Sequence, residues 1–464
     1  MQLPESLLKS LEGIQCFDRH AFEKVHQLNE HITSIRINPA KFKEPLTTHD
    51  LQLTTHQKIP WSQYGFYLDQ RPSFTFDPLF HAGCYYVQEA SSMFLEQALQ
   101  QIVDLSRPLR VLDLCGAPGG KSTHIQSLIS KDSLLVTNEV IKNRVSVLVQ
   151  NMTKWGCENV IVTHNDPKHC IRLEGYFDVI IVDAPCSGSG LFRKDVDAIG
   201  QWSINNVMLC SQRQQRILAD VLPSLKKNGV LIYSTCSYSK EEDEEIGDWL
   251  VEKLSMKNEK LKIGEAWGII ETISIKTGAK GYRFFPDKLK GEGFFLACFR
   301  KTQETSSLKI KNKNTWQINK QEQSVIDKWV SKENYSFFYN HHTVYALPEN
   351  IFHDYSFLKE YLNIHHAGVA IGQVLNNKFI SAHGLALSKL LSSKIPSIEL
   401  SYEQAIQYLQ KSDLNLSPEK HGWQVVSYKH YTLGWINALS NRINNYYPKE
   451  LRILKRHNDS SFGK

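Results

Sequence analysis

The stretch Phe177-Asp178-Val179-Ile180-Ile181-Val182-Asp183-Ala184-Pro185-Cys186-Ser187-Gly188-Ser189-Gly190 decides the fold of this chain. Four β-branched residues, Val179 to Val182, are followed by a carboxylate, a proline, a thiol and a glycine-rich loop. An uninterrupted apolar run is typical of a parallel strand covered on both faces, and open α/β sheets bind ligands at the carboxyl ends of such strands. A second run, Val230 to Tyr233, ends in Ser234-Thr235-Cys236-Ser237. We therefore expect two thiols at one edge of a parallel sheet.

Strand and helix patterns alternate on both sides of this stretch. From residue 110 the connections are short, which indicates a doubly wound parallel sheet. The expected strands are 110–114, 134–138, 159–163, 178–182 and 230–233, and helices are expected near 121–130, 142–155 and 203–221. Gly156 fits a left-handed C-cap, and strands near 282–285 and 293–299 should close the sheet as an antiparallel hairpin. The fold class is therefore α/β, with a Rossmann-like sheet.

Composition excludes several classes of protein. The chain has 464 residues, of which 41% are hydrophobic and 22% charged, as in ordinary soluble proteins of several domains. It has neither a long apolar run nor a signal pattern, so we expect a cytoplasmic protein without a membrane partner. Nine cysteines without CxxC spacing predict neither a disulfide framework nor a metal site.

Positive charge is concentrated in the C-terminal third. Residues 301–464 contain 20 Lys and Arg against 13 Asp and Glu, which favours a polyanion partner about as much as ordinary solvated lysines. We divide the chain into an N-terminal segment 1–75, a sheet domain 76–302, a polar linker 303–320 and two small modules, 321–400 and 401–464. On a short strand-like stretch of the first segment, Arg36 and Asn38 share a face, which suits either an RNA contact or a structural ion pair.

A glycine-rich loop follows the first strand of the sheet. Gly116-Ala117-Pro118-Gly119-Gly120-Lys121 lacks the G-x-G-x-x-G spacing of dinucleotide sites, and it is one residue too short for a P-loop. Glu139 ends the second strand, where such folds bind ribose hydroxyls, and Asp166 follows the third strand in a position to meet an adenine edge. The loop and the two acids together indicate S-adenosylmethionine as cofactor.

Thiols beside such a cofactor suggest a particular reaction. Carbon 5 of a pyrimidine is a poor nucleophile, and a thiolate that adds to carbon 6 activates it, which is covalent catalysis. A methyltransferase acting on an amino group would need no thiol. This chemistry requires one attacking cysteine, and the residues alone leave open whether it is Cys186 or Cys236.

Three stretches resemble the RNA 5-methylcytosine methyltransferases of the RsmB/RsmF/Sun family: Asp113 to Lys121, Asp183 to Gly188, and Ser234 to Ser237. The resemblance extends from about residue 30 to 300. It implies that Cys236 is the nucleophile and that Cys186 assists release of the methylated RNA. The implied cofactor-binding residues are Cys115, Gly116, Ala117, Pro118, Gly119, Gly120, Lys121, Glu139, Asp166 and Asp183, the last also near the target base. It further implies that Arg36 and Asn38 bind RNA and that Gln88 and Ser91 pack beside the cofactor.

The C-terminal part is similar to RsmF-type members of the family. The motifs are His383-Gly384-Leu385-Ala386-Leu387, Gly434-Trp435 and Asn445-Tyr446-Tyr447-Pro448-Lys449-Glu450. The resemblance implies a PUA-like RNA-binding module over 401–464 and an S-adenosylmethionine-dependent RNA (cytosine-C5) methyltransferase that forms 5-methylcytosine in 16S rRNA. We separately expect the protein to be a monomer.

Three alternatives are weighed against this function. A DNA cytosine methyltransferase typically uses the Pro-Cys thiol alone, which would leave Cys236 unexplained. A non-catalytic ribosome-assembly protein that binds RNA should have lost a thiol or the glycine loop, and both are present. Transfer RNA or another RNA remains open as the substrate.

Overall fold

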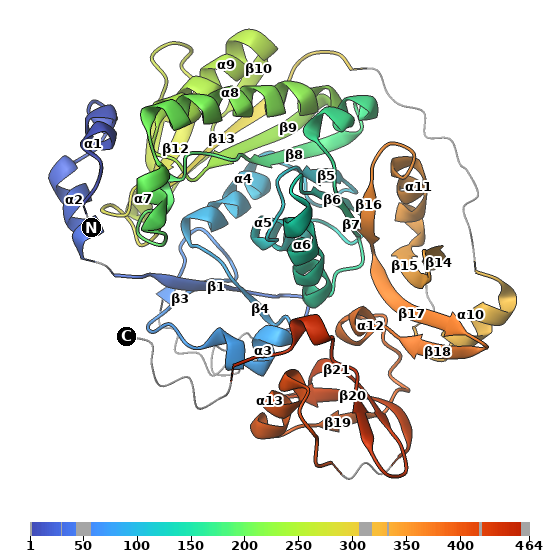
Figure 1. Cartoon of the computed structure of the whole chain (residues 1–464). Helices are drawn as coiled ribbons and strands as arrows, with labels where there is room; N and C mark the ends of the chain where they lie inside the picture. Colours follow the sequence, from blue (N-terminus) through green and yellow to red (C-terminus); the bar gives the residue numbers. More distant parts are fainter. Residues whose placement is uncertain are drawn as a thin grey trace.

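The structure is a computed structural model that describes residues 2–28, 30–42, 57–305, 318–331, 334–416 and 420–455. Most of the predicted linker, residues 306–317, lies outside this part of the chain. Within the described residues the strands form four sheets, and the largest runs through the middle of the molecule (Figure 1).

The central sheet has ten strands in the order β11-β12-β13-β9-β8-β5-β6-β7-β16, with β10 paired to β13. Its strands are β5 (Arg110–Asp113), β6 (Leu134–Asn138), β7 (Val160–Thr163), β8 (Phe177–Asp183), β9 (Leu225–Thr235), β10 (Met256–Glu259), β11 (Ile270–Ile273), β12 (Lys280–Phe284), β13 (Phe294–Lys301) and β16 (Ile364–Ala367). Strands β7, β6, β5, β8 and β9 are parallel, and β13 joins β9 antiparallel. The five predicted parallel strands and the closing hairpin of β12 and β13 are confirmed.

Helices cover both faces of this sheet, as expected for a doubly wound fold. Apolar side chains of α4 (Leu95–Ile102), α5 (Gly120–Leu128) and α6 (Lys142–Trp155) pack in the hydrophobic cluster on one face. Those of α8 (Ile204–Val221), α9 (Glu244–Leu254) and α11 (Glu349–Leu358) pack in the cluster on the other (Figure 1). Short α7 (Asp197–Gln201) precedes α8. Gly156 ends α6 with φ of 81°, which confirms the predicted left-handed cap.

A separate four-stranded sheet, ordered β2-β3-β1-β4, forms the core of the N-terminal part. The elements there are α1 (Glu5–Leu11), α2 (Arg19–Gln27), β1 (Thr33–Ile37), β2 (Gln57–Lys58), β3 (Gly65–Leu68), α3 (Pro78–His81) and β4 (Tyr85–Val87). Because β4 pairs antiparallel with β1, the predicted boundary at residue 75 lies inside this unit. Local patterns could not locate that boundary, since it depends on which distant strand β4 joins.

The C-terminal part contributes two more sheets. The first, β14-β15-β17-β18, consists of β14 (Tyr335–Asn340), β15 (Thr343–Pro348), β17 (Val369–Leu375) and β18 (Lys378–Ser381), with α10 (Lys320–Ile326) and α12 (His383–Leu387). The second consists of β19 (Ser397–Glu399), β20 (Gly422–Tyr428), β21 (Tyr431–Ala438) and β22 (Ile443–Asn445), with α13 (Tyr402–Gln410). Strand β16 leaves the first module to pair antiparallel with β7, and β19 begins before the predicted boundary at 401. Neither module is therefore separated as cleanly as the sequence suggested.

The two ends of the chain pack against each other. Leu79 and Tyr85 from the N-terminal part share a hydrophobic cluster with Tyr408 and Ile436 from the last module, and Figure 1 shows this module beside α3. The Tyr402 hydroxyl donates a hydrogen bond to the Phe76 carbonyl at 3.0 Å. In the described part of the chain, no helix has the length and apolarity needed to cross a membrane.

Candidate active site

The two predicted thiols lie in contact. Strands β8 and β9 run in parallel register with Asp183 opposite Ser234, so the loops that follow them leave the sheet side by side. The Sγ atoms of Cys186 and Cys236 are 3.0 Å apart, and both residues are half-buried. The hydrogen bond to the Cys236 sulfur, followed by burial, raises the pKa of Cys186 well above the usual value for a thiol. Either sulfur can act as the donor in this contact.

A lysine and a carboxylate form an ion pair beside the thiols. Lys121 Nζ lies 2.8 Å from Asp183 Oδ2, and the Ser234 hydroxyl donates to Asp183 Oδ1 at 2.8 Å. Burial lowers the pKa of Lys121, but the charge and hydrogen bond of Asp183 outweigh this effect and raise it above its usual value. The pair therefore carries one fixed positive and one fixed negative charge at the sheet edge.

The glycine loop leads directly into helix α5. Gly119 has φ of 116°, in the left-handed region, and serves as the N-cap of the helix. The Gly116 amide donates to the Asn138 carbonyl at 2.7 Å, and a Cβ at Gly116 would lie 2.0 Å from Thr137 Oγ1. The Asn151 side-chain amide donates a hydrogen bond to the Pro118 carbonyl at 2.8 Å. The loop is thus fixed against the end of β6, with the helix N-terminus at the carboxyl edge of the sheet.

Two acids at this edge, Asp113 and Glu139, each have one oxygen atom that accepts no hydrogen bond within the described part of the chain. Asp113 is fully buried, and burial raises its pKa to about 7 although Ser122 donates to Oδ2 at 2.6 Å. Among the described residues, Asp113 Oδ1 and Glu139 Oε2 have no hydrogen-bond partner, although Arg144 lies 3.3 Å from the latter. Each unsatisfied buried acceptor costs about 1–3 kcal/mol. A ligand that brings an amino group and hydroxyls would satisfy them, so these residues fit S-adenosylmethionine.

Asp166 follows β7 at the same edge of the sheet. Its Oδ1 accepts the Lys168 amide at 3.1 Å and so caps a short 3-10 helix, and the side chain is half-buried. The structure thus brings together the glycine loop, Glu139, Asp166 and Asp183 along the ends of four adjacent parallel strands.

Arg36 and Asn38 do not lie on a surface where RNA could bind, and here the sequence prediction was wrong. Both are at most 1% exposed. Arg36 donates to Gln88 Oε1 at 2.8 Å and to Thr123 Oγ1 at 2.6 Å, and Asn38 donates to the carbonyls of Gly83 and Trp155 at 2.9 Å. Their polar atoms join the N-terminal sheet to α5 and α6. Their role is therefore structural, with hydrogen bonds to neutral groups in place of the expected ion pair.

Gln88 and Ser91 also have partners inside the protein. Gln88 accepts from Arg36, and the Ser91 hydroxyl donates to the Glu292 carbonyl at 2.8 Å. Gln88 lies 4.0 Å from where a Gly120 Cβ would be, so this element packs on the glycine loop.

Sequence reasoning missed Ser234 and Glu242 as candidates. Ser234 could have been found from its place at the end of β9. Glu242 lies in an acidic run, Glu241 to Glu245, that is typical of a first helical turn, whereas it is fully buried beneath both thiol loops. No local sequence pattern distinguishes a buried glutamate that joins two loops from an exposed glutamate in a first helical turn.

The doubly wound sheet, its glycine loop and the acids at its carboxyl edge define the class of S-adenosylmethionine-dependent methyltransferases. Family models described as 16S rRNA methyltransferase RsmB/F, N-terminal domain of 16S rRNA methyltransferase RsmF, and Methyltransferase RsmF PUA domain match residues 100–300, 3–90 and 395–453. The chain belongs to the RsmB/F family of 16S rRNA methyltransferases and has the end domains of its RsmF type.

Individual relatives agree with this membership. Proteins named Ribosomal RNA small subunit methyltransferase F from Escherichia coli O9:H4 (strain HS) and Escherichia fergusonii are 29% identical over 443 and 444 residues, covering 90% of each chain. A solved methyltransferase homolog from Pyrococcus horikoshii has 28% identity and a TM-score of 0.52, covering 64% of this chain and all of its own. The structure of NSun6 from the same organism with SFG shares the fold at 19% identity and a TM-score of 0.53, covering 65% and 99%.

Proposed function

We propose that this protein methylates carbon 5 of a cytosine in 16S rRNA through a covalent bond between Cys236 and the base. The observation that carries the proposal is the 3.0 Å contact between Cys186 and Cys236 beside the Lys121–Asp183 pair. Methylation of an amino group or a hydroxyl needs no thiol, and two thiols in contact at the cofactor edge match a reaction that forms and then breaks a bond from sulfur to carbon.

Cys236 is the attacking residue in this mechanism. The pKa of the Cys186 thiol is raised, so Cys186 keeps its proton and can donate to the sulfur of Cys236. The Lys121 ammonium lies near enough to stabilise negative charge that develops on the Cys236 sulfur during the reaction. The thiolate forms a bond to carbon 6 of the cytosine, and the carbon 5–carbon 6 electron pair moves toward carbon 5. S-adenosylmethionine, when bound, supplies the methyl group to that carbon.

Cys186 acts in the second half of the reaction. Loss of the proton from methylated carbon 5 returns its electron pair to the ring, the carbon 5–carbon 6 double bond forms again, and the sulfur–carbon 6 bond breaks. The Cys236 thiolate then leaves with the electron pair of that bond. A hydrogen bond from the Cys186 thiol stabilises the departing thiolate, which explains physically how this residue assists release.

The remaining edge residues are proposed to hold the cofactor. The loop from Cys115 to Lys121 offers backbone groups at the α5 N-terminus, and Asp166 lies where an adenine edge would be. Glu139 Oε2 is paired with Arg144 but accepts no hydrogen bond from the residues that the structure describes, so it can accept one from a ribose hydroxyl. Asp183 sits between this loop and the thiols through its bond to Lys121, a position suited to contact both cofactor and base.

The substrate, RNA-binding regions and setting are proposed from the named relatives and the charge distribution. The relatives are small-subunit ribosomal RNA methyltransferases, and the C-terminal third carries the excess positive charge. We propose an RNA-binding role for the last module and the N-terminal domain packed against it, in a cytoplasmic protein that acts as a monomer.

The test is a methylation assay on purified small ribosomal subunits and on their free 16S rRNA. We expect one cytosine to become resistant to bisulfite conversion with the wild-type protein, and none with Cys236→Ala. Cys236→Ala should bind S-adenosylmethionine with a Kd within about twofold of wild type by calorimetry, because the thiol lies outside the glycine loop. A methylated nucleoside other than 5-methylcytidine, identified by mass spectrometry, would refute the reaction. Retained activity in Cys236→Ala would move the nucleophile to Cys186.

A further inference from the structure

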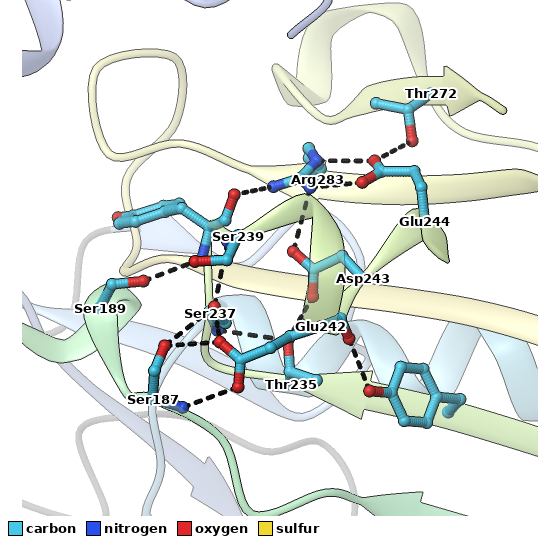
Figure 2. A network of polar contacts seen from close by, with 12 residues as sticks. Ser187, Ser189, Thr235, Ser237, Ser239, Glu242, Asp243, Glu244, Thr272 and Arg283 are labelled. Atoms are coloured by element: carbon cyan, nitrogen blue, oxygen red, sulfur yellow. Dashed lines mark hydrogen bonds and ion pairs between the residues drawn. The ribbon is translucent and has the colours of Figure 1, made fainter. Parts of the chain in front are cut away.

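A buried carboxylate joins the two loops that carry the thiols. Glu242 is fully buried, and its oxygen atoms accept hydrogen bonds from the Ser187 amide at 2.8 Å and the Ser187 hydroxyl at 2.5 Å. They also accept from the Ser237 hydroxyl at 2.6 Å and from Gln214 Nε2 at 3.2 Å. Figure 2 shows Glu242 between Ser187 on one loop and Ser237 on the other.

Two of the residues that donate to Glu242 are the sequence neighbours of the two cysteines. Ser187 directly follows Cys186, and Ser237 directly follows Cys236. One side chain therefore restrains the residue next to each sulfur. The loops are also joined directly, since the Gly190 amide donates to the Cys236 carbonyl at 2.8 Å and the Ser187 and Ser237 hydroxyls lie 3.3 Å apart. Glu242 adds a link from one carboxylate to the residue beside each sulfur.

Further contacts fix the backbone of Glu242 and the residue that follows it. Its carbonyl accepts the Tyr233 hydroxyl at 2.6 Å, which ties it to β9. The next residue, Asp243, accepts from Thr235 Oγ1 at 2.6 Å and pairs with Arg283 at 3.1 Å. Arg283 in turn donates to the Tyr238 carbonyl at 2.9 Å, within the network drawn in Figure 2. The Glu242 carboxylate is thus held in one position within the protein interior.

The four donors match a charged carboxylate. Burial raises the pKa of Glu242, and the hydrogen bonds from Ser187, Ser237 and Gln214 oppose that rise. A neutral glutamine could keep these contacts, because its NH2 group can donate to the Ser187 and Ser237 hydroxyls, which can also accept. Glu242→Met keeps the length of the side chain and removes both acceptor atoms, so it breaks all four links.

We propose that Glu242 is a positioning residue that holds the sulfur atoms of Cys186 and Cys236 in contact, so that the thiol that releases the RNA stays beside the thiol that attacks it. This role rests on the proposed two-cysteine reaction. In this role Glu242 contacts neither RNA nor cofactor, and it acts through Ser187 and Ser237.

The first experiment measures the thiol geometry without RNA. Diamide takes up two electrons and two protons from a pair of adjacent thiols, so the rate at which it forms a Cys186–Cys236 disulfide reports how often the sulfurs meet. We expect the rate, followed by mass spectrometry of peptides from the full-length protein, to fall about 10- to 100-fold in Glu242→Met, because displacements near 1 Å can cost a factor of that size. An unchanged rate would overturn the proposal, whatever the protein methylates.

Glu96→Met is the matched control. Glu96 is 1% exposed and also accepts from four donors, Ser62, Gln63, Gln100 and His124, but it lies on α4, away from both thiol loops. We expect Glu96→Met to lose thermal stability like Glu242→Met while keeping the wild-type disulfide rate. If both variants slowed disulfide formation equally, general loosening would be the cause and the positioning role would be wrong.

A milder variant keeps the test valid if Glu242→Met fails to fold. Ser187→Ala combined with Ser237→Ala removes two donors and leaves the carboxylate with two partners, so the disulfide rate should fall by a smaller factor. With 16S rRNA and S-adenosylmethionine, the same variants should accumulate more covalent protein–RNA adduct per turnover than wild type on denaturing gels. A changed disulfide rate without any adduct in any variant would support the positioning role and refute the covalent reaction.

Discussion

Replacing Arg36 tests whether this residue is part of the interior or part of an RNA-binding surface. The guanidinium of Arg36 is 1% exposed and links β1 to α5, the helix that begins at the glycine loop. The Arg36→Met variant keeps the length and apolar stem of the side chain but removes all five donors.

The expected loss follows from the contacts. The two short hydrogen bonds, to Gln88 at 2.8 Å and to Thr123 at 2.6 Å, each involve a charged donor, and such bonds contribute about 1.5–3 kcal/mol. The guanidinium also lies 4.6 Å from the Trp155 ring centroid, a cation–π contact that adds about 1–2 kcal/mol when desolvated. Since these terms are not additive, we expect Arg36→Met to lower the free energy of unfolding by about 4 kcal/mol.

Urea unfolding followed by circular dichroism measures this loss. The control is Arg213→Met, at an exposed position on α8, which should change the free energy of unfolding by less than about 0.5 kcal/mol. The affinity for 16S rRNA should then be measured at several salt concentrations, under conditions where both variants are folded. We expect the affinity of Arg36→Met to depend on salt concentration with the same slope as that of the wild-type protein. A variant of wild-type stability whose salt slope is shallower would refute the structural role and restore Arg36 as a phosphate contact.

Three other predictions concern catalysis, pH and RNA binding. Cys186→Ala should trap the protein on its RNA, seen as a slow band on denaturing gels, because the departing Cys236 thiolate loses its hydrogen bond; lost turnover without an adduct would contradict the release role. The pKa of Asp113 is raised to about 7 in the folded protein from a usual value of 3.8, so the native state keeps a proton that the unfolded chain has lost. The free energy of unfolding of the cofactor-free protein should therefore fall as pH rises from about 4 to 7, and a series of urea melts should show a smaller fall in Asp113→Asn. Replacing exposed Lys449 and Arg452 of the last module with Gln should weaken RNA binding and reduce the salt slope by up to about 1.4–1.8; an unchanged slope would mean that these cations are only solvated.

The parallel sheet and its ligand edge were predictable because their signals are local. The apolar runs in β8 and β9 are long enough to require burial on both faces, and such strands place their carboxyl ends together. The glycine loop is likewise a local signal, since Gly119 adopts a left-handed backbone that other residues avoid. These patterns were sufficient to predict that Cys186 and Cys236 would lie at one edge of the sheet, which their 3.0 Å contact confirms.

The partners of polar side chains were not predictable in the same way. Arg36 alternates along β1 as a surface residue would, and only the packing of the N-terminal sheet against α5 buries it. Glu242 looks like a helix-dipole acid until the β8 and β9 loops close over it. The pairing of β16 with β7 is of the same kind, because a strand's sequence does not name its neighbour.

The sequence by itself therefore determined the fold class, the family and the two thiols, since each depends on residue type and spacing within short segments. Only the tertiary structure decided which charged residues are interior links, where the N-terminal unit ends, and what holds Cys186 against Cys236. The physical reason is that a buried charge is stabilised by donors from distant segments, such as Ser187 and Ser237 around Glu242, and these meet only when the chain is folded.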